Sequence, residues 1–270
     1  MGVLGLLSYE ILGRAPFRRP HRPVTDHMAA DQRTLRTAEH RLYLVIAILF
    51  PLIVLAGFGR TYYLKFAFDT PPLPGTLVHL HGILMTAWVA LFLTQVYLIS
   101  AKRIKTHMSL GLLGIALAAA IIPVGFLTGA ASAKYGSTAS PPGISPLSFF
   151  IVPFVDMVYF AAVFGLAIYY RKRAADHKRL MLLTAINFLP PAVARIPIAQ
   201  LQAFGPLFFF GVPTLAAIIL VIYDTRKHGK LNKLFAAGAA VLVVSYPLRL
   251  VISSTETWMN FAAWVTTWAA

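Results

Sequence analysis

Residues 77–100, LVHLHGILMTAWVALFLTQVYLIS, decide the fold of this chain because they form a long apolar stretch without Lys, Arg, Asp or Glu. A helix needs about 20 mostly apolar residues to cross the hydrocarbon core of a bilayer. Six further stretches have the same character: 42–59, 108–130, 148–170, 180–201, 205–223 and 233–252. We therefore expect an all-α fold, a polytopic bundle of seven transmembrane helices.

The composition of the whole chain supports a membrane protein. Of its 270 residues 58% are hydrophobic and only 12% are charged, with a mean hydropathy of +0.72, which is too apolar for a soluble domain. The formal net charge of +15 lies mostly in short segments between the apolar stretches. This pattern indicates membrane topology and excludes a nucleic-acid footprint, so the expected partner is the lipid bilayer.

Cysteine is absent from the chain. Disulfides, thiolate metal sites and c-type haem attachment are therefore excluded. A metal ion or haem iron would need His, Met or carboxylate ligands.

The basic residues predict the orientation in the membrane. The N-terminal arm with Arg41 carries seven Lys and Arg residues, and segments 101–106, 171–179 and 224–233 carry three, five and four. With seven crossings all of these lie on one side, and the opposite side keeps only Arg60, Lys65 and Lys134. The positive-inside rule then places the N-terminus in the cytoplasm and the C-terminus in the periplasm of a bacterial inner membrane.

Three regions follow from this topology. Residues 1–40 form a basic, weakly ordered cytoplasmic arm, and residues 41–252 form the seven-helix transmembrane domain. Residues 253–270 form an aromatic periplasmic tail whose tryptophans, Trp258, Trp264 and Trp268, are expected to lie at the membrane interface. The fifth crossing is the least regular, because three prolines and Arg195 interrupt it.

Ionisable residues inside the crossings are the candidates for function, because an unpaired charge in hydrocarbon costs several kcal/mol. They map to the periplasmic half of the bundle, together with polar and aromatic neighbours that complete a candidate ligand-binding site: His79, His81, Trp88, Asp156, Asn187, Arg195, Tyr246 and Arg249. We expect these side chains to converge in one pocket.

The two histidines of this site are candidate metal or haem ligands. His81 shares one helix face with Met85, Trp88 and Gln95, whereas His79 lies on another face, so a regular helix cannot aim both rings at one ion. His81 is therefore predicted to be the ligand or proton carrier and His79 to support it. The alternative is that both histidines only bond neighbouring helices.

One carboxylate with two guanidinium groups leaves an excess of positive charge that suits an anionic ligand. Arg195 and Arg249 would hold its anionic groups, and Asp156 would balance their charge. The alternative is an internal salt bridge of Asp156 with one arginine, which fixes helix packing.

A secondary haem or metal site is predicted at the cytoplasmic boundary, formed by His107 and His177. Each stands in a basic loop three residues before a Leu that opens an outward-running helix, and His228 repeats the pattern. The repeat suggests three helical hairpins after a first crossing.

Several of these motifs together resemble a family of uncharacterised bacterial seven-helix inner-membrane proteins. The matching residues are Arg60-Thr-Tyr-Tyr-Leu-Lys65, Pro71-Pro-Leu73, His79-Leu-His-Gly82, Thr86-Ala-Trp88, Gln95, His107 with Leu110-Gly111, and His177-Lys-Arg-Leu-Met181. The helix starts are also similar, more loosely, to oxidase-assembly proteins and to b-type membrane cytochromes. Unlike those cytochromes, the chain lacks two pairs of mid-helix histidines.

The resulting hypothesis is a membrane protein that binds haem b, a metal ion or a quinone-like redox ligand, in a respiratory role and with a redox or respiratory complex as partner. A small-anion or proton transporter is the first alternative, and a non-catalytic subunit or assembly factor is the second. Whether the protein is an enzyme stays open.

Overall fold

The structure is a computed structural model that describes residues 24–73, 75–136 and 143–268, with only the helical backbone over 24–38. It divides into two units, Met1–Glu39 and His40–Ala270. Every regular element in the described ranges is a helix. The first helix, α1, begins at Val24, so residues 24–40 are helical although the sequence predicted a weakly ordered arm there.

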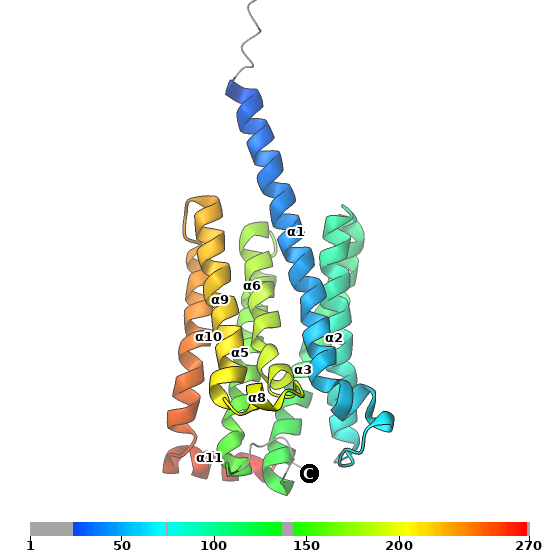
Figure 1. Cartoon of the computed structure of the whole chain (residues 1–270), viewed down its shortest axis with the longest axis vertical. Coiled ribbons are helices and arrows are strands. Elements are labelled where there is room, and N and C mark those ends of the chain that lie inside the picture. The colour runs from blue at the N-terminus through cyan, green and yellow to red at the C-terminus, as the bar shows by residue number, and fades with distance from the viewer. Residues whose placement is uncertain (1–23, 74, 137–142, 269–270) are drawn as a thin grey trace, which may run out of the picture. The chain divides into compact units, whose positions relative to one another are not determined.

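The elements follow one another in the order of Figure 1. They are α1 (Val24–Phe58), the π-helix η1 (Gly59–Tyr63), the 3₁₀-helix η2 (Lys65–Ala67), α2 (Thr76–Ser100), α3 (Ile104–Tyr135), α4 (Pro146–Phe149), α5 (Ile151–Tyr169), α6 (Ala174–Asn187), α7 (Leu189–Val193), α8 (Ala199–Gln202), α9 (Pro206–His228), α10 (Lys233–Ile252) and α11 (Glu256–Thr266).

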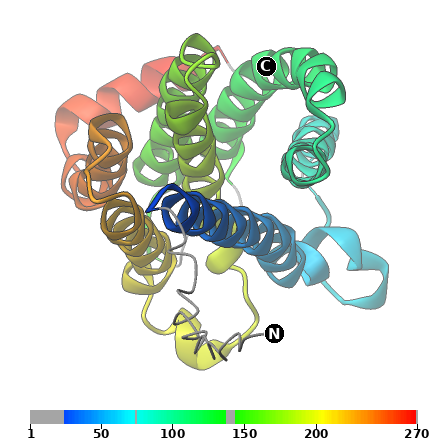
Figure 2. The same ribbon diagram turned by 90° about the horizontal axis from the view of Figure 1, so that it is seen from above.

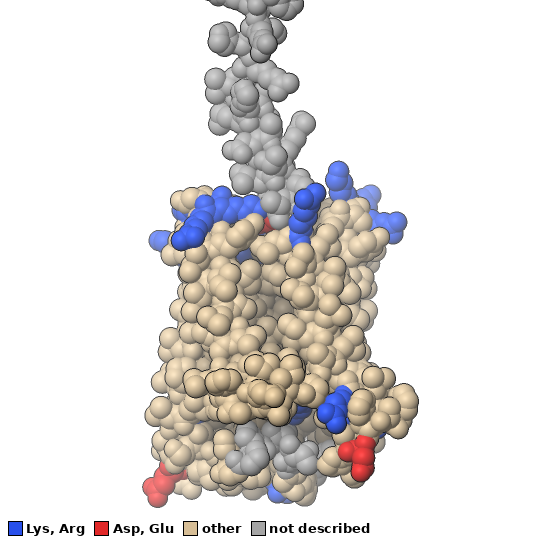
Figure 3. Space-filling model, in the orientation of Figure 1, with Lys and Arg blue, Asp and Glu red and all other residues tan. Residues whose placement is uncertain are grey.

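Six helical segments of the described chain are long and apolar enough to cross a membrane: Glu39–Tyr63, Thr76–Ser100, Ile104–Tyr135, Pro146–Tyr169, Pro206–His228 and Lys233–Ile252. Large apolar side chains such as Leu112 and Val251 point outward, and each is more than 60% exposed. Figure 3 shows a wide uncharged band with most Lys and Arg side chains at one end. The chain is therefore a multi-pass membrane protein.

Within His40–Ala270 the long helices pair as antiparallel hairpins. Both views place α5 and α6 in the middle, with α2 and α3 on one side and α9 and α10 on the other (Figures 1 and 2). The repeated basic loops of the sequence, each with a histidine three residues before a leucine, predicted these three hairpins. The central pair contributes the largest share of the buried core, including Phe160, Leu180 and Leu183, so side chains on α5 and α6 are those most shielded from lipid.

The fifth predicted crossing, 180–201, is not one helix. Its helix begins earlier, as α6 at Ala174, and ends at Asn187, and α7 resumes for five residues with prolines in its first turn. The backbone then leaves the helical conformation before α8. Proline has no N–H to donate and clashes with the preceding turn, which explains the interruption.

Local sequence signals set several helix ends. Asn232 caps α10 by accepting a hydrogen bond from the Phe235 amide at 2.9 Å, and Thr255 caps α11 through the Trp258 amide at 3.3 Å. Gly229 ends α9 with a φ of +63°, a conformation that glycine adopts without steric cost.

The aromatic C-terminal segment is a packed helix as well as an interfacial one. Trp264 and Trp268 are more than half exposed, as predicted for interfacial anchors, but Trp258 is buried. Its indole N–H donates to the Leu147 carbonyl at 3.0 Å, and its ring packs against Phe150 and Phe154. Trp258 is therefore packed inside the bundle, where its polar tip has an internal partner.

Candidate functional site

Four of the predicted site residues gather around Arg249, and together with Ser245, which was not predicted, we name them the Arg249 cluster: Asp156, Asn187, Ser245, Tyr246 and Arg249. The guanidinium donates to Asp156 Oδ1 at 2.6 Å and to Ser245 Oγ at 3.2 Å. Asn187 donates to the main-chain carbonyl of Asp156 at 3.1 Å. Arg249, Asp156 and Asn187 are all buried, so this ion pair is the internal salt bridge that was one of the two expected alternatives.

The Arg249 cluster lies deep in the bundle. Asp156 is the eleventh of the 24 residues in Pro146–Tyr169, close to the middle of that segment. Arg249 stands near the end of α10, and its long side chain reaches back past the Tyr246 ring, 5.1 Å from the guanidinium carbon. Helical side chains point toward the helix N-terminus, which brings the guanidinium to the depth of the carboxylate.

Three polar atoms of the Arg249 cluster are buried without a hydrogen-bond partner: Asn187 Oδ1, Tyr246 Oη and Arg249 Nε. Such atoms are uncommon in folded proteins, and each costs about 1–3 kcal/mol. The ion pair itself is short, at 2.6 Å, but the polar atoms around it are incompletely hydrogen-bonded.

A second group, the Arg195 cluster, comprises Phe58, His81 and Arg195. Arg195 lies in the break between α7 and α8 and donates to the Pro191 carbonyl at 2.8 Å. Its guanidinium carbon is 5.0 Å from the centre of the Phe58 ring, and its charge acts on the His81 ring. No carboxylate in the described chain pairs with it, so this half-buried cation has only neutral or basic neighbours.

The predicted single pocket is thus two clusters. No hydrogen bond or ion pair joins the Arg195 cluster to the Arg249 cluster in the part of the chain that the structure describes. Asp156 pairs with Arg249 alone, because its depth along α5 matches the reach of that side chain. Arg195 is left at the end of the interrupted helix.

The histidines of α2 separate as their spacing predicted. His79 is exposed, and its ring centre lies 6.2 Å from that of Tyr62. His81 is half-buried, and its Nδ1 has no partner. Metal binding by both rings together stays a prediction that this geometry does not favour.

The polar face predicted on α2 is distinctive. His81 Nδ1, Trp88 Nε1 and Gln95 Oε1 recur at seven-residue intervals, and all three atoms are buried without a partner. Trp88 packs edge-on against Phe160 and Phe164 at 5.0 and 5.5 Å. It belongs to the central core, and the structure shows no contact of its ring with Arg195.

The predicted secondary pair, His107 and His177, comes together from two different hairpins. The ring centres lie 6.4 Å apart, where α3 and α6 both begin. His177 Nδ1 bonds the Ala167 carbonyl at 2.8 Å, whereas His107 Nδ1 is buried without a partner.

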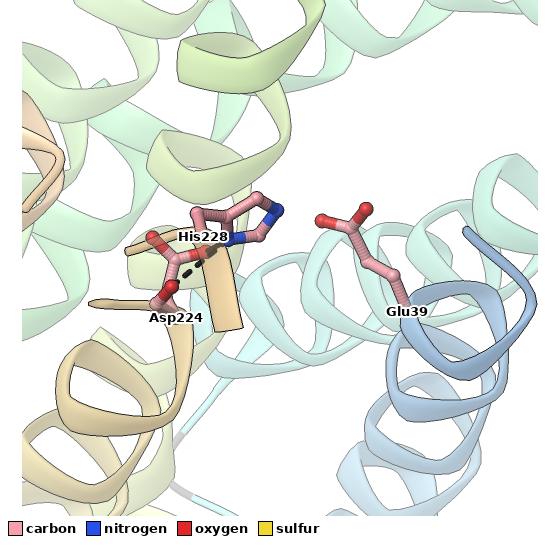
Figure 4. Close-up of side chains that lie close together, drawn as sticks. All are labelled: Glu39, Asp224 and His228. Atoms are coloured by element: carbon pink, nitrogen blue, oxygen red, sulfur yellow. Dashed lines mark hydrogen bonds and ion pairs between the residues drawn. The ribbon is translucent and has the colours of Figure 1, made fainter. Parts of the chain in front are cut away.

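A buried ionic network near this pair was not predicted. Arg179 binds both carboxylate oxygens of Asp224, at 2.9 and 2.7 Å, and both residues are buried. His228 lies one turn after Asp224, and its Nδ1 is 3.3 Å from Asp224 Oδ1 (Figure 4). Glu39, which Figure 4 also labels, is the last residue of the unit Met1–Glu39. Asp176 accepts from Asn232 at 2.7 Å and pairs with Arg173.

One feature of the sequence could have indicated this network. Asp176 and Asp224 are acidic residues in segments otherwise crowded with Lys and Arg. Carboxylates in such surroundings are good candidates for internal ion pairs.

The motifs that carried the family resemblance collect around two places. At one end, Tyr63 bonds Thr86 at 2.9 Å, the Tyr62 ring packs on Gly82, and Lys65 donates to the carbonyls of Thr70 and Pro71. At the other end lie the His107 and His177 motifs. Comparison with known proteins finds no matching family model, curated protein or solved structure.

Proposed function

We propose that the protein binds a small anion at the Arg195 cluster and carries it across the membrane. The observation that supports this function is the missing counterion of Arg195. A cation within the bilayer thickness is costly unless it is paired or hydrated. A bound oxyanion would supply the missing charge, and His81, with its unpartnered Nδ1, would donate a second bond when Nδ1 carries the proton.

The interrupted helix supports transport as well as binding. Broken helices are a recurring feature of transporter binding sites, because freed backbone groups bind substrate and the break gives the element room to move. The α7 segment is held closely by α1, since a Cβ on Gly57 would overlap the Ala192 carbonyl. Movement of the Arg195 segment would therefore be transmitted to α1.

The proposal places α6 and α7 together as a further crossing, which gives seven. Their combined path from Ala174 to Val193 is about 30 Å at 1.5 Å per residue, the thickness of the hydrocarbon core. With the basic end in the cytoplasm, the Arg195 cluster faces the periplasmic half of a bacterial inner membrane.

This orientation is testable because the chain has no cysteine. A cysteine at exposed Ser254 should react with a membrane-impermeant maleimide in intact cells, whereas one at exposed Lys230 should react only after lysis. The opposite labelling pattern would place the Arg195 cluster on the cytoplasmic side.

Transport is tested with purified protein in liposomes, using uptake of radiolabelled inorganic phosphate and of succinate as probes. We expect saturable uptake of at least one probe, its loss in Arg195→Leu and its retention in Arg60→Leu, which removes an exposed arginine from η1. Arg195→Lys should keep part of the activity because it keeps the charge. Equal uptake by wild type and Arg195→Leu would refute the proposal.

A quinone-like redox ligand is the second candidate function. The unpartnered His81 Nδ1 and Trp88 Nε1 share one face of α2 and suit carbonyl oxygens. The protein extracted from its native membrane would then carry a quinone that chromatography of the organic extract detects, and His81→Phe would lose it. This function implies a respiratory redox complex as partner.

A further inference from the structure

We infer that His107 and His177 form a binding site for one transition-metal ion of the kind that imidazole prefers, zinc or copper. The inference does not depend on the anion site, since His107 and His177 lie in the first turns of α3 and α6, whereas Arg195 follows the end of α7. It rests on the distance between the rings, on the hydrogen bond that orients the His177 ring, and on two buried atoms without partners, His107 Nδ1 and Gln95 Oε1.

The distance is that of two imidazoles on one ion. A metal–imidazole nitrogen bond is about 2.0–2.1 Å, so an ion between two rings places their centres roughly 5 to 6.5 Å apart. The observed 6.4 Å lies at the wide end of that range, with the ring planes at 78°. The rings are therefore separated enough to admit an ion.

The His177 ring is held in the manner of a metal ligand. His177 Nδ1 lies 2.8 Å from the Ala167 carbonyl, which makes it the protonated nitrogen and leaves Nε2 with its lone pair. A ligating histidine commonly donates its other N–H to a backbone carbonyl, which fixes the tautomer and the ring orientation.

The candidate ligand atoms beside these two rings lack hydrogen-bond partners. His107 Nδ1 is buried and makes no hydrogen bond, and the same holds for Gln95 Oε1. Gly111, one turn after His107, faces the Gln95 amide, so Gln95 and His107 border the same space between α2 and α3. A purely structural histidine would leave its nitrogen unsatisfied, whereas a bound ion uses it; the amide oxygen would bind the ion or a water on it.

The nearby cations do not occupy this space. The Lys178 ammonium lies over the Tyr43 ring at 5.7 Å, and Arg173 is engaged with Asp176.

The test uses the full chain, purified in detergent, stripped with a chelator, loaded with Zn²⁺ or Cu²⁺ and desalted before metal analysis. We expect wild type to retain one ion per chain of at least one of the two metals. His107→Ala and His177→Ala should each lose this ion, with affinity reduced by at least about 100-fold. His40→Ala, which removes an exposed ring from α1, is the matched control and should bind like wild type.

A measurement on the unaltered chain guards against variants that fold poorly. The Cu²⁺-loaded protein should show electron paramagnetic resonance hyperfine structure from two imidazole nitrogens, and Zn²⁺ should raise its thermal unfolding temperature. Wild type that retains neither metal, or histidine variants that retain as much as wild type, would overturn the inference. These results are independent of phosphate or succinate uptake.

Discussion

Replacing Arg249 with leucine should be among the most damaging single substitutions in the bundle. The change removes the hydrogen bonds of the guanidinium to Asp156 Oδ1, Ser245 Oγ and the Val152 carbonyl. It also leaves a carboxylate with 7% side-chain exposure near the middle of an apolar helix. Breaking one partner of a buried pair costs about 3–5 kcal/mol.

This cost should be visible as a lower unfolding temperature. For chains of about 150–250 residues, 1 kcal/mol shifts Tm by about 2–4 °C, so Arg249→Leu should unfold roughly 6–20 °C below wild type. The assay is thermal unfolding of detergent-purified protein, followed by loss of the monodisperse peak on size exclusion. Arg60→Leu, an exposed arginine, should stay within about 0.5 kcal/mol of wild type.

The double variant decides whether the ion pair is the cause. Asp156→Leu with Arg249→Leu removes both charges, and it should be more stable than either single variant, because no lone charge stays buried. Additive losses in this cycle, or an Arg249→Leu protein that unfolds like wild type, would show that the pair does not hold α5 to α10.

Three further predictions follow from packing and capping. Gly57→Ala should destabilise the protein by about 1–3 kcal/mol because its methyl group overlaps the Ala192 carbonyl, whereas Gly59→Ala, which meets open space, should lower Tm less; equal melting would contradict the close approach of α1 and α7. Asn232→Ala should cost about 1–2 kcal/mol, since it removes the α10 cap and a bond to Asp176, and an unchanged unfolding temperature would show that neither matters. Trp258→Phe keeps an aromatic ring but loses the indole N–H and its hydrogen bond to the Leu147 carbonyl, so we expect the free energy of unfolding to fall by about 1 kcal/mol. Trp264→Phe, which replaces an exposed indole, is the neutral comparison in the same thermal unfolding assay.

The long helices were predictable because their signal is local. A run of apolar residues such as 77–100 has one membrane solution, and the predicted ends of α2 and α10 lie within one residue of the observed ones. The spacing of His81, Trp88 and Gln95 placed them correctly on one face, since helix periodicity depends on nothing outside the helix.

The partners of the charged residues were harder to predict because they depend on packing between distant segments. Asp156 and Arg249 are 93 residues apart, and Arg179 and Asp224 are 45 apart. Depth along each helix suggested that Asp156 would meet an arginine, but only the side-chain reach selects Arg249 over Arg195. The helix break after Asn187 was signalled by prolines, yet its position depends on how α7 packs against α1.

The ion pair across the bundle sets an order of events during synthesis. When α5 leaves the ribosome its carboxylate has no cation, and the 93 residues to Arg249 take about 5 to 20 s to translate. During that interval α5 must stay near the insertion machinery, keep its acid protonated, or wait beside water. The last long helix therefore completes the burial of a helix made well before it, and a chain truncated before α10 should be recognised as unfinished by membrane quality control.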